Sequence, residues 1–501
     1  MENTTVWITI AVYVAVMIII GIVSGRESKS IADLTVGGRN AGAWLSALSY
    51  GTAYFSAVMF VGYAGGTGLN YGLWGIAAGI GNAVFGSWLA WRVLARRTRD
   101  VSDRLKIKTM PQFFELRYNS RAMKIFACMV IFIFMIPYSA SVYKGLASVA
   151  DVLLGIDDKI CMIIIAVLAA VLLLLGGYLV QARADFVQGI VMMFGITLVI
   201  RCDRVGGIEG LREYANSAEG LPKLGLKSAT SLIATVLMTS FGTWGLPQMI
   251  QKYFGIKDDK QAKRGIVIST FFALLVAGGG YFIGSLHRFF TADEIASFKK
   301  PVQDYVVPNM LKVANLPNIL LGIVLVLLIA ASVSTLCSIT LTASSTFSMD
   351  FVKSVLKPGM KEKKVTVLTK VLCVVFILCS YVVANTDTPI LDMMSYSWGI
   401  ISGSFLAPYV VALFWKRMNK HGAWAAMIGG FSVAIVPAIC KLLVEFGVNN
   451  STASTLAGFG PLFACIAMLL SLALCFIVSA ITGKDDKNVT ELFYNGIVEK
   501  E

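Results

Sequence analysis

The chain has 501 residues and a mean hydropathy of +0.75, and 57% of its residues are hydrophobic while only 14% are charged. Soluble domains carry about 25% charged residues, so this composition excludes an ordinary soluble protein and predicts a polytopic membrane protein. The net charge of +14 does not indicate a nucleic-acid partner, because the lysines and arginines gather in short loops between long apolar runs.

Apolar runs long enough to cross about 30 Å of hydrocarbon recur along the whole chain. They begin near Val6, Ala41, Gly72, Met123, Ile160, Phe186, Lys227, Ile266, Asn318, Val365, Met393, Gly422 and Gly458. The sequence therefore predicts an all-α fold with about thirteen transmembrane helices in a lipid bilayer. Basic loops after the first, third, seventh, ninth, eleventh and last runs predict a plasma-membrane protein whose N-terminus lies outside and whose C-terminus is cytoplasmic.

Two of these runs, the second and the seventh, are interrupted by glycine or proline. The second contains several glycines between positions 51 and 68, and the seventh contains residues 242–248 with Pro247 among them. Broken spans five helices apart point to two inverted repeats with a solute site between them. The alternative is that the glycines only let helices pack closely. That alternative suits Gly62 and Gly65 but does not explain Pro247 beside Thr239 and Thr243.

The expected organisation is a single membrane domain that spans residues 1–501. The first repeat covers residues 41–205 and the second covers residues 227–416. Residues 1–40 and 422–501 form peripheral helices and a tail.

Small polar residues interrupt the apolar runs at two places, residues 51–56 and residues 331–335. Hydrocarbon supplies no water to a hydroxyl or to an unwound carbonyl, so such stretches persist where they line a cavity, pack against protein or hold an ion. Sodium is a hard cation that needs an oxygen cage, and the adjacent hydroxyls of Ser334 and Thr335 suit that need. The sequence therefore predicts a sodium site. A lone Ser-Thr pair would more often bond its own helix.

The chain resembles the sodium:solute symporter family over nearly its whole length. The stretches that carry the resemblance are residues 34–39, residues 48–57, Gly176-Gly177-Tyr178 followed by Asp185-Phe186-Val187-Gln188, and residues 331–335. The resemblance implies a LeuT-type five-plus-five inverted-repeat core with two broken helices. The sodium ligands it implies are the backbone carbonyls of Thr52, Phe55 and Ala331 and the hydroxyls of Ser334 and Thr335.

The resemblance also implies a role for Asp185. It resembles an Asp of the family that helps sodium to pass and that, in some sialic-acid carriers, joins a second sodium site with hydroxyls on the ninth span. Those hydroxyl positions match Ser334, Cys337 and Ser338, and Cys337 departs from the pattern. Asp185 and Ser338 are therefore candidates for sodium transit or a second sodium site. The alternative for Asp185 is a surface ion pair with Arg183.

The solute pocket is harder to predict. Where the proline carriers have an Asp this chain has Tyr54, and their two pocket aromatics align with Thr239 and Thr243, so the resemblance disfavours proline. A local resemblance to pantothenate carriers suggests a small organic acid. The candidate solute-binding residues are Tyr54, Met59, Tyr138, Ser141, Thr243 and Trp244, with plain helix packing as the alternative for each. Lys144 either meets a solute carboxylate or extends to the membrane interface.

Together these features predict a sodium-coupled secondary active symporter that imports a small polar solute, with an organic acid favoured. Its expected partners are the solute, the sodium ion and the bilayer. A symporter for a sugar or an amino acid is the first alternative. A transporter-like sensor is the second, and the short tail after residue 483 disfavours it. An enzyme is not expected, because the chain lacks HExxH and GxSxG motifs and paired intramembrane carboxylates.

Overall fold

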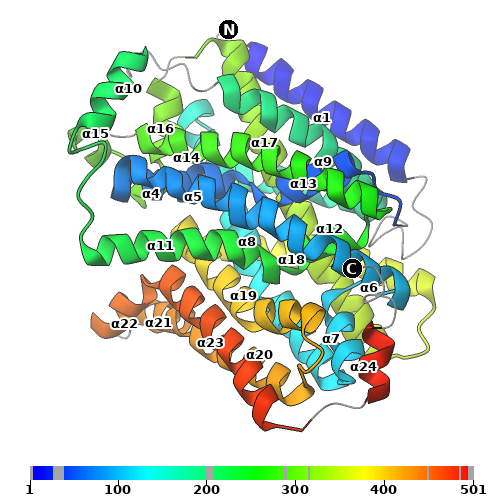
Figure 1. Ribbon diagram of the computed structural model, residues 1–501. Helices are drawn as coiled ribbons and strands as arrows, with labels where there is room; N and C mark the ends of the chain where they lie inside the picture. Colours follow the sequence, from blue (N-terminus) through cyan, green and yellow to red (C-terminus); the bar gives the residue numbers. More distant parts are fainter. Residues whose placement is uncertain are drawn as a thin grey trace.

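The computed structural model describes residues 4–25, 39–198, 207–286, 290, 292–313, 316–386, 388–447, 451–483 and 487–494. Within these residues the regular elements are helices (Figure 1), and the only strand-like contact is an isolated bridge between Ala41 and Ile256. Ten of the described helices are long and apolar enough to cross a membrane, or eleven if a bent pair counts as one span. Residues 34–38, which contribute to the family resemblance, lie outside the described residues.

The first half of the chain begins with one whole helix and one broken helix. These are α1 (Thr4–Gly25), then α3 (Ala43–Tyr54), the π-helical turn η2 (Val58–Tyr63) and α4 (Ala64–Tyr71). They are followed by η3 (Gly72–Gly75), α5 (Ile76–Gly81), η4 (Asn82–Leu89), η5 (Trp91–Ala95), α6 (Arg96–Leu105), α7 (Met110–Tyr118), α8 (Arg121–Leu154) and α9 (Asp158–Leu198).

The second half begins with the other broken helix. It comprises α10 (Gly207–Asn216), α11 (Leu226–Phe241), η7 (Gly242–Gly245), α12 (Pro247–Phe254), α13 (Asp259–Ala273), η8 (Leu274–Gly278), α14 (Gly279–Ser285), α15 (Ala292–Ala296), η10 (Val302–Asp304) and α16 (Val306–Val313). The chain continues with α17 (Asn318–Thr346), η11 (Phe347–Leu356), α18 (Glu362–Ala384), α19 (Ile390–Phe414), α20 (Lys420–Ala434), α21 (Val436–Glu445), α22 (Ser451–Ala457), α23 (Gly460–Ile481) and α24 (Lys487–Tyr494).

Each apolar run predicted from the sequence lies at or close to a helix. The runs predicted from Ile160 and from Phe186 both fall in α9, of which Asp158–Leu175 is long and apolar enough to count as a span. The run from Ala41 is divided, because α3 is a short helix before the break and the rest continues into Val58–Leu105. The count of ten or eleven is made over the described residues, in which the runs from Ala41 and Phe186 do not form separate spans.

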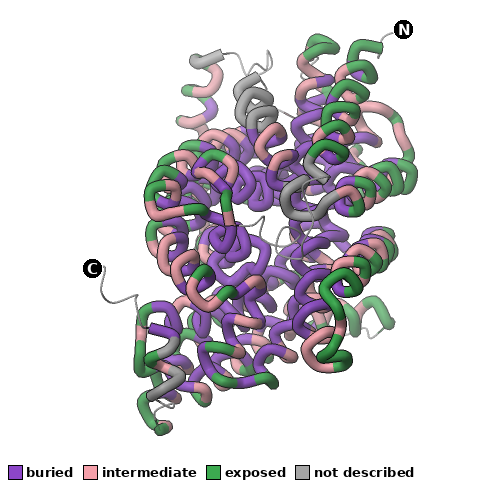
Figure 2. The backbone as a smooth tube through the Cα atoms, turned by 90° about the vertical axis from the view of Figure 1, so that its right-hand side faces the viewer, coloured by how far each residue is buried: buried purple, intermediate pink, exposed green. Residues whose placement is uncertain are grey.

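Buried residues fill the interior of the bundle, and exposed residues lie on its outside (Figure 2). Many of the exposed residues are large and hydrophobic. Helix α17 packs against α1, α8 and α9, while α19 packs against α8 and α23. Figure 1 shows α1 and the α20–α23 group at opposite sides of the bundle, which is where the peripheral helices are expected. On α1, large apolar side chains such as Ile8 and Val12 are exposed. This surface suits contact with lipid.

Both broken helices have a local cause. Helix α3 ends at Tyr54 because Phe55 is extended, with φ −102° and ψ 102°. In the other, Leu246 is extended and Pro247 begins α12, so that α11 and α12 are bent by 47°. Proline has no N–H to donate into a preceding turn and suits the first position of a new helix. Gly245 also has no room for a side chain, because a methyl group there would lie 2.9 Å from the Leu406 backbone nitrogen.

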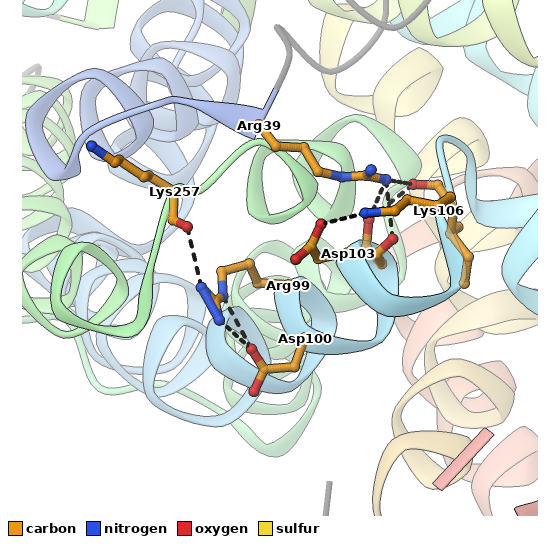
Figure 3. Close-up of polar contacts among 8 residues, drawn as sticks. Arg39, Arg99, Asp100, Asp103, Lys106 and Lys257 are labelled. Carbon is orange, nitrogen blue, oxygen red and sulfur yellow. Dashed lines mark hydrogen bonds and ion pairs between the residues drawn. The ribbon is translucent and has the colours of Figure 1, made fainter. Parts of the chain in front are cut away.

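The outer ends of the two broken helices are joined at one end of the molecule, here called the basic end. The Ala41 N–H donates to the Gly255 carbonyl over 3.0 Å, and the Lys257 N–H donates to the Ala41 carbonyl over 3.1 Å. Arg39 and Arg99 lie beside this pairing (Figure 3). The Arg39 guanidinium donates to the Ile107 carbonyl over 2.7 Å, and that of Arg99 donates to the Lys257 carbonyl over 3.3 Å.

Candidate functional site

The predicted sodium ligands of α3 and α17 meet at the first break. The Thr335 hydroxyl donates to the Thr52 carbonyl over 3.1 Å and lies 3.0 Å from the Ala331 carbonyl of its own helix. Phe55 is the residue at which the helical ladder of α3 stops, and carbonyls at a helix end lack the partner of a continuous helix. The site is therefore a buried group of carbonyl and hydroxyl oxygens from two helices, which is the kind of ligand set a hard cation prefers.

The fifth predicted ligand, Ser334, turns toward α9. Its hydroxyl donates to Asp185 Oδ1 over 2.6 Å, and Ser49 of α3 donates to Asp185 Oδ2 over 2.5 Å. Asp185 is completely buried, so the alternative that placed it in a surface pair with Arg183 is wrong. Since a hydroxyl has one proton and two lone pairs, donation to Asp185 leaves the Ser334 oxygen able to accept a cation.

A lysine that the sequence analysis did not select completes this group. Lys252 of α12 places its ammonium 3.2 Å from Asp185 Oδ2 and donates to the Ser49 hydroxyl over 2.7 Å. Both ionised side chains are buried, with Lys252 only 2% exposed. A signal was available in the sequence, because Lys252 is a charged residue within a few positions of the Pro247 break. A charge in such a segment marks a functional position.

The other residues considered for a second sodium site lie further along α17. Ser338 is buried one turn beyond Ser334. Cys337 also faces α9, and its thiol lies 3.8 Å from the Ala169 carbonyl.

Two predicted solute residues, Tyr54 and Tyr138, meet at a tryptophan. The Tyr54 ring centroid lies 6.1 Å from that of Trp398, and the Tyr138 ring meets the same indole edge to face at 5.6 Å. The Tyr54 hydroxyl donates to the Thr239 carbonyl over 2.6 Å, so the end of α3 is tied to α11. Trp398 of α19 is a central residue of this cluster, and the sequence analysis did not select it.

Thr243 lies close to Tyr54, with Gly86 of η4 between them. The Thr243 hydroxyl donates to the Ser240 carbonyl over 2.8 Å and lies 3.5 Å from the Gly86 carbonyl. A methyl group on Gly86 would lie 2.2 Å from the Tyr54 hydroxyl oxygen. The two predicted residues therefore approach each other only because position 86 is glycine. Next to Thr243, the Trp244 indole donates to the Phe85 carbonyl over 3.0 Å.

Three other residues considered for the solute lie in different surroundings. Met59 packs toward α14, where its sulfur would be 3.1 Å from a methyl group on Gly280. The Ser141 hydroxyl donates to the Tyr138 carbonyl of its own helix over 2.7 Å. Lys144 donates to the Thr388 carbonyl over 2.8 Å and lines a separate cavity of about 230 Å³.

A larger cavity of about 420 Å³ opens at the end opposite to the basic end. It is lined by Asn70 of α4, Thr235 of α11, Gln303 of η10 and Asp392 of α19, among others. Thr235 is one turn before Thr239, whose carbonyl holds the Tyr54 hydroxyl. The cavity therefore lies at the outer ends of α4 and α11. We call it the vestibule.

Gln248 is another residue that the sequence analysis did not select. It follows Pro247 in the first turn of α12 and is completely buried. Within the part of the chain that the structure describes, neither its amide nitrogen nor its amide oxygen has a hydrogen-bond partner. An unpaired buried amide is destabilising by about 1 to 3 kcal/mol, so this side chain is available to form hydrogen bonds with a polar ligand.

Comparisons with known proteins agree with this geometry. The model of the sodium:solute symporter family matches residues 34–430, so the chain belongs to that family and is a transporter. Among its relatives is the "Osmoregulated proline transporter OpuE" of Bacillus subtilis (strain 168), 26% identical over 98% of each chain. Another is the "High-affinity proline transporter PutP" of the same organism, 27% identical over 95% of this chain and 98% of the relative.

Solved structures show the fold. A Na+-coupled sialic acid symporter, described as substrate-bound and outward-open, matches with a TM-score of 0.77 and 17% identity over 97% of this chain and 99% of that one. Mhp1, a nucleobase-cation-symport-1 family transporter, matches with a TM-score of 0.51 and 12% identity over 92% and 97%. The prediction of an all-α, LeuT-type sodium:solute symporter is confirmed, as is the prediction that the protein is not an enzyme.

Proposed function

We propose that this symporter imports a small solute bearing a carboxylate, driven by a sodium ion held by Thr52, Phe55, Ala331, Ser334 and Thr335. The observation that carries the proposal is the contact of the Thr335 hydroxyl with the Thr52 carbonyl at the break in α3. The sodium ion then links α3 to α17, so its binding favours one arrangement of the broken helix. Sodium and solute thereby promote each other's binding.

The sodium assignment is tested with alanine variants of the two hydroxyl ligands. Ser334→Ala and Thr335→Ala should each raise the sodium concentration that gives half-maximal uptake by about ten-fold, since each removes an oxygen from the cage. Ser332→Ala is the matched control, because that hydroxyl lies on the same helix and donates to the Leu328 carbonyl over 2.8 Å. Unchanged sodium dependence in both ligand variants contradicts the assignment.

The solute class rests on the break before α12. The N-terminal end of a helix carries partial positive charge and favours an anionic group. Here that end holds the buried Gln248 amide, and the aromatic rings of Tyr54, Tyr138 and Trp398 meet at the end of α3, in the other broken helix. This combination suits a small molecule with a carboxylate and an apolar body.

Two solutes of this class are favoured by different observations. Proline is the solute in the names of the two relatives, which are 26% and 27% identical to this chain. A non-amino organic acid is favoured by Tyr54 and Thr243, the positions at which the chain departs from the proline carriers. Uptake into proteoliposomes across a panel of both kinds, with sugars included, distinguishes them. Sodium-driven uptake of sugars alone contradicts the proposed class.

The proposed orientation is that of a plasma-membrane protein with an external N-terminus and a cytoplasmic C-terminus, so that the basic end faces the cytoplasm and the vestibule faces outward. It is tested in a variant without native cysteines. A cysteine at Asn70 in the vestibule should react with an impermeant thiol reagent in intact cells, whereas one at Lys363 should not. The reverse pattern contradicts the orientation.

A further inference from the structure

The pair of Lys252 and Asp185 is a buried ion pair directly beside the proposed sodium site. One oxygen of the Asp185 carboxylate accepts from both the Lys252 ammonium and the Ser49 hydroxyl. The other oxygen accepts from Ser334. Four helices, α3, α9, α12 and α17, thus meet at one carboxylate.

The surroundings of the Lys252 ammonium are those of a small cation site. Two of its oxygen partners, a hydroxyl at 2.7 Å and a carboxylate at 3.2 Å, are of the kinds that also bind sodium. The ammonium carries the same single positive charge as sodium but cannot leave, because it is attached to α12. A buried carboxylate needs a counter-charge, and this one already has a covalently tethered counter-charge.

A second mobile cation at Asp185 would therefore have to share the carboxylate with the Lys252 ammonium. Like charges a few ångströms apart repel strongly in a buried site. A sodium ion bound beside Ser334 already places one mobile positive charge close to this carboxylate. The electrostatics thus allow one sodium ion and disfavour two.

Resting on the sodium site proposed above, we propose that Lys252 is a built-in cation which takes the place of a second sodium ion at Asp185. The native protein then moves one sodium ion with each solute molecule. Replacing Lys252 by a neutral side chain removes the tethered charge and leaves Asp185, Ser49 and Ser334 to bind an additional sodium ion. Lys252 is thus a specificity-determining residue for the number of ions carried.

The experiment compares the native protein with Lys252→Met, which keeps the length and apolar stem of the side chain and removes its charge. Purified protein in proteoliposomes is used to measure the charge moved per solute from the reversal potential. The native protein should move one sodium ion per solute with a hyperbolic sodium dependence. Lys252→Met should move two sodium ions per solute, with a sigmoidal dependence of uptake on sodium concentration. Lys252→Arg, which keeps the charge, should retain the native ratio.

The double variant Lys252→Met with Asp185→Asn should lose the additional ion, because the carboxylate that holds it is gone. If Lys252→Met does not transport, the test is the number of radioactive sodium ions that the detergent-purified variant binds. Size-exclusion chromatography checks that the variant is folded. An unchanged count in folded Lys252→Met, no sodium binding by that variant, or two ions in the native protein overturns the proposal. Native protein that transports solute without any sodium dependence contradicts the proposed function instead, so the two failures are distinguishable.

Discussion

The two ends of this transporter are built differently. At the basic end, α3 and α12 are held together by backbone hydrogen bonds through Ala41, with the guanidinium groups of Arg39 and Arg99 bonded beside them. At the other end, α4, α11 and α19 surround the vestibule of about 420 Å³. The two broken helices are thus joined by backbone hydrogen bonds at the basic end, whereas a cavity lies beside them at the other end. The comparison indicates that the basic end is the more tightly joined of the two.

The largest expected effect comes from making the closed end permanent. A disulfide between Ala41→Cys and Ile256→Cys, the two residues of the isolated bridge, should lower uptake to about a tenth or less of the reduced protein, because transport requires both ends to open in turn. Sodium-dependent solute binding from the vestibule should persist. Uptake by the oxidised and the reduced protein is compared, with each single-cysteine variant as a control. Equal uptake in both states contradicts the assignment of this end as a gate.

A smaller effect is expected at the break between α11 and α12. Thr243→Tyr adds an aromatic ring beside Gly86 and Tyr54, a site without free space for it, and should weaken solute binding by about ten-fold. Sodium affinity should change little, because the proposed ligands lie on other helices. Both affinities are measured separately in purified protein. Normal solute binding by the variant places Thr243 outside the pocket.

The vestibule end should also respond to pH through Asp304. Burial in η10 raises the pKa of this carboxyl to about 7 from 3.8, although it accepts from the Ile390 N–H over 3.2 Å. The folded protein therefore holds a proton that the unfolded chain has lost, so stability falls as the pH rises from about 4 through about 7. Melting temperature should be about 1 °C higher at pH 6 than at pH 8. Asp304→Asn should lose that difference, and an unchanged difference in this variant excludes Asp304 as its source.

The smallest effect is expected at the ion pairs on the surface of the basic end. Asp259 lies 3.1 Å from both Arg96 and Arg99, but its side chain is 33% exposed. Exposed pairs contribute about 0.2 to 1 kcal/mol, so Asp259→Asn should change the free energy of unfolding by no more than this and leave uptake nearly unchanged. A large loss of uptake would show that charges, in addition to the backbone pairing, hold this end together.

The sequence predicted the elements of this structure better than their contacts. The breaks at residues 51–56 and 242–248 were predictable because glycine, proline and small polar residues inside an apolar run act locally. The contact of Thr335 with Thr52 followed from the family resemblance, while the places of Trp398 and Gln248 did not. Trp398 meets Tyr54 across more than 300 residues of chain, and an apolar run does not specify which helix it will face. Lys252 was also missed, although its charge near a break was a local signal that could have identified it.

The pairing at Ala41 also bears on the equilibrium between conformations of the protein. The two backbone bonds through Ala41 and the bond from the Ala43 N–H to the Gln261 side chain of α13, at 3.0 Å, are all replaced by bonds to water when α3 separates from α12 and α13. Such an exchange costs only about 0.5 to 1.5 kcal/mol for each bond. The three bonds together cost about 1.5 to 4.5 kcal/mol, so on their account alone the alternative conformation is a minor population, between about 7% and less than about 0.1%, in the absence of ligands. To make it the major conformation, the ligands would have to bind it more tightly than the other one by at least the ratio of the two populations.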